Sequence, residues 1–123
     1  MRTESKGDRH VFAQATPELP VRDVIAAQIH YRDRLGFTIA WHNEDGRIGA
    51  VAHGACAIFL RGVDGPIAPV TLWIFAADVD AACRDLTALG ADIVDPLADK
   101  PWGLRQFTVR DGDGHLIHIH HDL

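Results

Sequence analysis

Two stretches of the chain carry apolar residues at every third or fourth position, the spacing of an amphipathic helix. Each stretch begins after an aspartate that can cap a helix and ends at a Leu-Gly pair, where glycine can close the helix. The pattern predicts one helix from Asp23 to Leu35 and another from Asp78 or Asp80 to Leu89. The expected buried stripes are Val24, Ala27, Tyr31 and Leu35, and then Val79, Ala82, Leu86 and Leu89.

Apolar and β-branched runs between turn residues predict strands on both sides of each helix. The run before the first helix contains Pro17 and Pro20, which favour an edge strand. Each half of the chain therefore has the order βαβββ. The predicted strands are 12–21, 37–42, 48–52 and 55–61 in the first half, and 70–76, 91–94, 104–110 and 115–121 in the second.

The two halves repeat each other at an offset of about 55 to 60 residues. We expect one α+β domain over residues 1–123, with curved mixed sheets and helices on the outer face. It consists of two tandem βαβββ modules, about 12–62 and 70–123, joined by linker 63–69, with 1–11 as a flexible arm. Pairing of the sheets is expected to leave a trough between them, where a ligand would bind.

Composition narrows the function classes mainly by exclusion. The chain has 123 residues, 47% of them hydrophobic, and a net charge of −5, which suits a globular domain and argues against nucleic acid. Apolar runs are too short to span a membrane, and residues 1–15 lack a signal-peptide core. We therefore expect a cytoplasmic protein with neither a nucleic-acid nor a membrane partner. Cys56 and Cys83 are expected to be reduced core residues.

The last 23 residues predict a hairpin of two strands joined by a turn at 111–114. Strand alternation places Ile117 and Ile119 on one face, which must be buried, and His118 and His120 on the other. These imidazoles could bind a metal, form hydrogen bonds in a pocket, or face solvent. The neighbouring histidines, at positions 115 and 121, are expected on the other face or in turns.

The order and spacing of four segments resemble the glyoxalase/bleomycin-resistance/dioxygenase superfamily, also called vicinal oxygen chelate proteins. The resemblance covers residues 15–121 and is greatest for the bleomycin-resistance branch. The segments are ATPELPVRD (15–23), YRDRLGF (31–37), WIF (73–75) and PWGLRQFTVRDGDGHLIH (101–118).

Enzymes of this superfamily bind a divalent metal through four strand positions. The resemblance places these positions at Thr16, Ile58, Thr71 and His118. Isoleucine cannot coordinate a metal, and threonine hydroxyls are poor ligands beside imidazoles or carboxylates. We therefore expect no metal and no cofactor. The alternative is a metal-dependent lyase, isomerase or dioxygenase that uses His118 with unusual partners.

The bleomycin-resistance branch implies binding rather than catalysis. Its members sequester the drug in clefts shared by two chains and exchange an N-terminal arm about a proline that matches Pro17. The resemblance implies a homodimer with residues 1–15 exchanged. Its expected function is metal-independent binding of a small planar antibiotic, neutral or cationic and similar to bleomycin, with no catalytic residues.

Aromatic side chains are expected to form the ligand-binding face, because flat rings stack on planar heterocycles. Thr71, Trp73 and Phe75 share one face of their strand, and Trp102 lies in a Pro-Trp-Gly loop that leaves its indole free to close over a ligand. Acidic residues near the mouth would favour a cation; Glu44, Asp45, Asp64 and Asp99 are candidates. The complete expected ligand-binding set is Thr71, Trp73, Phe75, Trp102, His118, Trp41 and Phe59.

The aromatic assignments have structural alternatives. Trp73 and Phe75 could pack in the core between sheet and helix, although Leu72 and Ile74 already supply core-facing residues. Trp102 could instead anchor its loop on its own module. A neutral His118 could fix a polar group of a ligand by hydrogen bonding.

Overall fold

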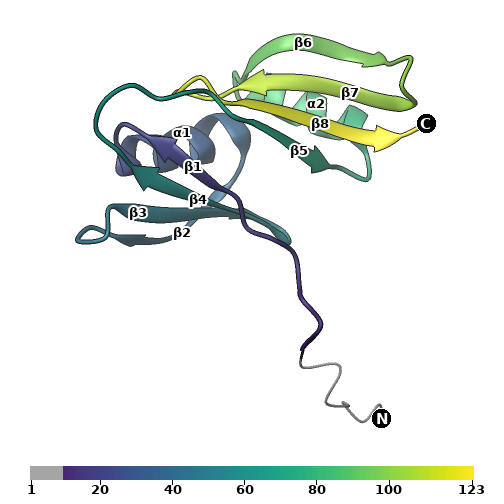
Figure 1. Cartoon of the computed structure of the whole chain (residues 1–123). Helices are drawn as coiled ribbons and strands as arrows, with labels where there is room; N and C mark the ends of the chain where they lie inside the picture. Colours follow the sequence, from purple (N-terminus) through teal and green to yellow (C-terminus); the bar gives the residue numbers. More distant parts are fainter. Residues whose placement is uncertain (1–9) are drawn as a thin grey trace.

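The computed structural model describes residues 10–123 and confirms the α+β fold of two βαβββ modules (Figure 1). Residues 1–9 of the predicted arm lie outside the described part. The first module contains β1 (Glu18–Val21), α1 (Val24–Leu35), β2 (Thr38–Asn43), β3 (Ile48–His53) and β4 (Cys56–Gly62). The second contains β5 (Thr71–Phe75), α2 (Val79–Ala88), β6 (Asp92–Asp99), β7 (Leu104–Arg110) and β8 (Leu116–Asp122).

The two sheets have the same topology. Their strand orders are β1-β4-β3-β2 and β5-β8-β7-β6, with β1 parallel to β4, β5 parallel to β8, and all other pairs antiparallel. β1 is an edge strand, as its prolines predict, but it begins at Glu18 rather than at residue 12. β6 continues to Asp99, beyond the predicted 94, because an edge strand tolerates Pro96 at a register shift.

Aspartate caps begin both helices. Asp23 Oδ1 accepts a hydrogen bond from the Ala26 amide at 3.0 Å, and Asp78 Oδ1 accepts one from the Ala81 amide at 3.0 Å. Asp78 is thus the cap of α2, and Asp80 instead pairs with Arg105 at 2.8 Å. The predicted stripe of α1 is buried throughout. That of α2 is buried only at Val79; Ala82 and Leu86 are half-buried and Leu89 is exposed.

The helix-facing sides of both sheets contribute to one hydrophobic core. Val51 and Ile58 of the first sheet join Val109 and Ile117 of the second in this cluster, together with the buried stripe of α1. Cys56 and Cys83 are free thiols packed against it. In Figure 1, α1 lies between the first sheet and the second module. Neither helix of residues 10–123 is long and apolar enough to cross a membrane.

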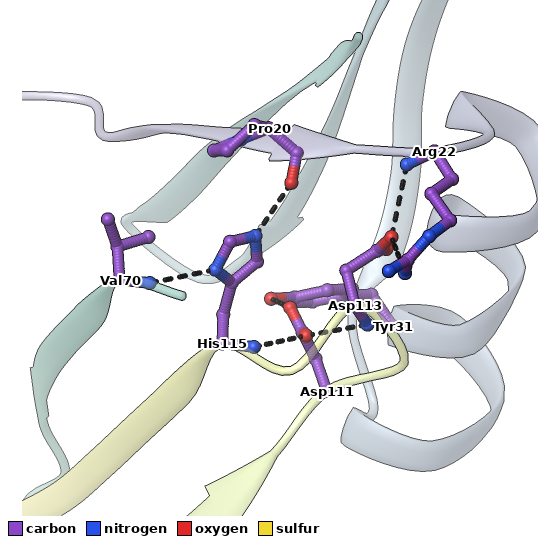
Figure 2. A network of polar contacts seen from close by, with 7 residues as sticks. All are labelled: Pro20, Arg22, Tyr31, Val70, Asp111, Asp113 and His115. Carbon is purple, nitrogen blue, oxygen red and sulfur yellow. Dashed lines mark hydrogen bonds and ion pairs between the residues drawn. The ribbon is translucent and has the colours of Figure 1, made fainter. Parts of the chain in front are cut away.

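A buried polar network joins the modules at the β7–β8 turn (Figure 2). The Tyr31 hydroxyl on α1 donates to Asp111 Oδ2 at 2.6 Å, while Asp111 Oδ1 accepts from the amides of Asp113 and His115 at 3.0 and 2.9 Å. Burial, reinforced by the Asp111 carboxylate, holds the pKa of Tyr31 well above its ordinary value. The tyrosine hydroxyl therefore remains a donor. The predicted turn is also a contact between the two modules.

His115 is the second part of this junction. Its imidazole is fully buried: Nδ1 lies 3.0 Å from the Val70 amide nitrogen and Nε2 lies 2.6 Å from the Pro20 carbonyl oxygen (Figure 2). The amide can only donate, so Nδ1 accepts and Nε2–H donates to Pro20. A single neutral imidazole thus links β1 to the start of β5. The pattern placed this residue on the other face of its strand or in a turn and did not reveal this role.

We expect His115→Ala to destabilise the protein by about 2–4 kcal/mol, because it leaves the Val70 amide and the Pro20 carbonyl unpaired and opens a cavity. Urea unfolding measures the change. The control is His42→Ala, which removes an exposed imidazole. Equal stability losses in the two variants would contradict a structural role for His115.

Candidate ligand-binding site

The side of the second sheet that faces away from the shared core, called its outer side below, carries a row of polar and aromatic side chains. Asp95 pairs with Thr108, Thr108 with His118, and His118 with Trp73, so the row crosses all four strands. Residues on this side alternate with the core residues Val109 and Ile117. The predicted separation of the β8 histidines from its isoleucines is confirmed, since Ile117 and Ile119 are buried and His118 and His120 are half-buried.

Trp73 and Phe75 lie on this outer side and not in the core. Trp73 is 54% exposed and Phe75 is 63% exposed, whereas Leu72 and Ile74 pack against the core. The Trp73 ring lies 4.2 Å from the His118 ring, centroid to centroid, at an angle of 38°. Both aromatic residues also contact His120, at centroid distances of 5.7 and 6.1 Å. The structure thus supports a stacking surface rather than the core alternative.

His118 is held by a neighbouring hydroxyl. Thr108 Oγ1 lies 2.6 Å from Nδ1 of His118, which leaves Nε2 as the ring nitrogen available to a ligand. Burial lowers the pKa of His118, with smaller contributions from His120 and Lys100, and Asp95 opposes this shift. The imidazole is therefore neutral at pH 7 and can donate or accept a hydrogen bond.

Trp102 combines an anchored edge with an exposed ring. Its Nε1–H donates to Oε1 of the buried Gln106 at 2.9 Å, yet the residue is 59% exposed. The Lys100 ammonium lies 5.9 Å from the Trp102 ring centroid and pairs with Asp95 at 2.8 Å. The indole is thus fixed beside the outer face of the second sheet rather than free to swing. The pattern did not reveal that Gln106 and Lys100 contact Trp102.

The first sheet has a matching row on its outer side. Trp41 pairs with Ala50, Ala50 with Phe59, and Phe59 with Glu18. The Trp41 and Phe59 rings meet at a centroid distance of 5.3 Å and an angle of 61°. They lie on either side of Ala50, whose small side chain leaves room for this contact. Trp41 and Phe59, both in the expected ligand-binding set, thus lie together on the side of the first sheet that faces away from its helix.

The register corrects the predicted metal positions. Glu18 and Trp73 each lie five positions before their helix cap, and they pair with Phe59 and His118 respectively. Phe59, not Ile58, is thus the counterpart of His118. Ile58 is fully buried in the core on the opposite side of the sheet. The position expected to match His118 was therefore one residue too early. A shift of one residue moves a side chain to the opposite face of a strand.

The donor set does not fit a divalent metal. The four matched positions hold Thr16, Phe59, Thr71 and His118, of which only the histidine is a good ligand. Within residues 10–123, no three His, Cys, Asp or Glu side chains converge on a common point. No metal-dependent step can be built from these residues.

Arginine and lysine side chains neutralise several carboxylates near the two outer faces. Asp99 pairs with Arg105 at 2.9 Å, and Glu18 pairs with Arg61 at 3.1 Å. Asp64, an expected cation-attracting residue, pairs with Arg47. Glu44 and Asp45 lie in the exposed β2–β3 turn. These pairs favour recognition of a ligand by stacking and hydrogen bonding more than by charge.

The space between the modules of one chain is not the expected aromatic trough. A groove of about 1120 Å³ lies there, but many of its walls come from the helix-facing sides, including Phe37, Leu72 and Leu86. Of the predicted ligand residues, it includes only Trp73 and Phe75. Because the modules share a core, their aromatic rows lie on the outer sides of the sheets and do not enclose a cleft within one chain.

The comparison with known proteins identifies the family. The model described as the Glyoxalase/Bleomycin resistance protein/Dioxygenase superfamily matches residues 10–119. The chain therefore belongs to this superfamily, which confirms the resemblance seen in its motifs. No curated protein matches the sequence significantly.

Solved structures agree with this assignment. TioX from Micromonospora sp. ML1 is 31% identical, with a TM-score of 0.74, over 90% of this chain and 100% of TioX. A bleomycin-binding protein complexed with bleomycin is 21% identical, with a TM-score of 0.80, over 91% of this chain and 100% of its own. A bleomycin resistance determinant encoded on the transposon Tn5 is 21% identical, with a TM-score of 0.79, over 90% and 98%. The last two identities show a shared fold alone.

We expect His118 to make stability depend on pH. Its folded pKa lies below the ordinary 6.5, so between the two values the unfolded chain binds more protons than the folded chain. The stabilising contribution is complete above pH 6.5 and is lost as the pH falls through the folded pKa. Urea unfolding of wild type and His118→Gln between about pH 8 and about pH 5 measures this term. Parallel stability profiles would contradict it.

Proposed function

We propose that this protein is a homodimer that binds and sequesters a small planar molecule without changing it chemically. The observation that carries the proposal is the exposed stack of Trp73 on His118. An exposed tryptophan face beside a neutral, hydrogen-bonding imidazole can bind a planar ring and orient its polar group.

The aromatic row of the first sheet supports a site shared by two chains. The exposed Trp41 and the half-buried Phe59 form a second aromatic surface, which cannot meet Trp73 within one chain. A second copy that places its first sheet against the second sheet of its partner would enclose a ligand between the two rows, once in each half of the dimer. Exposed aromatic surface of this kind is typical of interaction sites.

The N-terminal segment supports an exchanged arm in this dimer. Val11 and Phe12 are 72% and 94% exposed, and they precede Gln14, Ala15 and Pro17, which line the groove between the modules. Two exposed apolar residues beside an apolar groove favour insertion into a second copy. In this proposal Pro17 directs the arm away from its own chain.

Bleomycin is the first ligand to test, because a fold neighbour is a bleomycin-binding protein in complex with that drug. The ligand class proposed here is a planar antibiotic, neutral or cationic. Calorimetric titration with bleomycin, with and without copper, and with unrelated planar compounds would define the ligand and its metal requirement together. Stoichiometric divalent metal in protein purified without added ions would contradict metal-independent binding.

Trp102→Ala is expected to weaken ligand binding by about 1–3 kcal/mol with little change in melting temperature, because an exposed aromatic anchor contributes more to binding than to folding. Titration with bleomycin and thermal unfolding measure the two effects. His42→Ala is the control for an exposed aromatic side chain outside both rows. Unchanged affinity in Trp102→Ala would remove Trp102 from the site.

Deletion of residues 1–15 is expected to weaken the dimer, because it removes the apolar segment proposed to insert into the partner. Sedimentation velocity over a range of concentrations measures the association. Phe12→Ser is the matched point variant and should weaken the dimer in the same direction. A sedimentation profile identical to that of the full chain would contradict an exchanged arm.

A further inference from the structure

A β-bulge in β2 determines which face of the first sheet carries Trp41. Ile39 pairs with Val51, but Trp41 pairs with Ala50, so two residues on β2 oppose one on β3. In an unbroken strand Trp41 would lie on the same side as Ile39, the helix-facing side to which Val51 also belongs. The bulge instead turns Trp41 to the outer side, where it meets Phe59.

The buried side chain of Gln28, on α1, forms hydrogen bonds with both strands at this bulge. Its Nε2 donates to the Trp41 carbonyl at 2.8 Å and to the Ala50 carbonyl at 3.2 Å. Both N–H groups of one amide are therefore used, and the two acceptors lie on the two strands at the point where the register shifts. Gln28 is only 2% exposed, and a buried amide on a helix stripe is costly unless it is paired in this way.

Gly49 provides the space for this contact. A Cβ at position 49 would lie 2.5 Å from Gln28 Nε2 and 2.9 Å from Val24 Cγ1. Any larger residue would displace the amide or the helix. The bulge, the glutamine and the glycine form one local arrangement.

The second module shows the same register shift with a different arrangement of side chains. Ile93 pairs with Val109, but Asp95 pairs with Thr108, so Asp95 is the counterpart of Trp41. The helix residue that matches Gln28, five positions after its cap, is Cys83, whose thiol is only a weak donor. Asp95 is held on the outer side by Lys100 at 2.8 Å. In the second module, the side chain of Asp95 is held by a partner on the outer side of the sheet. In the first module, the backbone of Trp41 is held by Gln28 from the helix-facing side.

We propose that Gln28 is a positioning residue for the ligand site: it maintains the bulge that presents Trp41 beside Phe59 on the outer face of the first sheet. The proposal rests on the proposed function in that Trp41 is taken to contact the ligand. Gln28 itself is buried beneath the sheet and acts only through Trp41.

The test uses Trp41 as a reporter. The chain has three tryptophans, so Trp73→Phe with Trp102→Phe leaves Trp41 alone. In this background Gln28→Met, which has similar length but no donor, should lose the near-ultraviolet circular dichroism of Trp41 and change its quenching by acrylamide. Gly49→Ala should give the same loss, because it displaces the amide without removing it.

The control is Leu35→Ala, a buried position two turns further along the same helix than Gln28. It should reduce stability and leave the Trp41 signal unchanged. An unchanged signal in both Gln28→Met and Gly49→Ala would overturn the proposal. Equal signal changes in Leu35→Ala and Gln28→Met would also overturn it, since general loosening would then be the cause.

Binding is measured separately, in chains that keep all three tryptophans. Gln28→Met should weaken bleomycin binding by about three- to tenfold, the loss of one aromatic contact, while Leu35→Ala retains wild-type affinity. Unaltered bleomycin affinity in Gln28→Met would overturn the role of Gln28 in the site. Failure of wild type to bind bleomycin would count against the proposed function for that drug, and the Trp41 signal would still decide whether Gln28 positions Trp41.

Discussion

The buried polar junction between the modules is the constraint on which the rest of the structure depends. His115 links β1 to the start of β5, and Asp111 ties the β7–β8 turn to Tyr31 on α1. Buried polar groups of this kind are costly unless every partner is in place, so they favour one relative placement of the modules. That placement brings the helix-facing sides of both sheets into one core. It also leaves both aromatic rows on the sides of the sheets that face away from this core.

The two rows show how one scaffold can serve different chemistries. Along the two rows the register is the same, with a bulge at the same point and a parallel pair at the same edge. Their side chains differ: Trp41, Ala50, Phe59 and Glu18 in one row, and Asp95, Thr108, His118 and Trp73 in the other. The four positions that match the metal ligands of the superfamily's enzymes hold one histidine, two threonines and one phenylalanine. The residues favour stacking and hydrogen bonding over metal-assisted chemistry.

Many local features could be predicted from the sequence because they depend on nearby residues. The capping aspartates, the glycines after the helices, the repeat of βαβββ order and the apolar side of β8 all follow from spacing along the chain. The exposure of Trp73 and Phe75 also followed, because Leu72 and Ile74 already supplied the apolar side of their strand. Membership of the superfamily could be recognised from the order of the motifs.

Only the tertiary structure decided the features that depend on contacts between distant segments. A bulge moves every later residue of a strand to the other face of the sheet. The sequence around Trp41 does not indicate the bulge, because the hydrogen bond that holds it comes from Gln28 on α1. The one-residue error at Ile58 has a related cause, because strand register is set by pairing across the sheet. The sequence could place His115 only on the other face of its strand or in a turn, because its partners, Pro20 and Val70, come from distant parts of the chain. By itself, the sequence determined which elements form; long-range packing determined which faces they present.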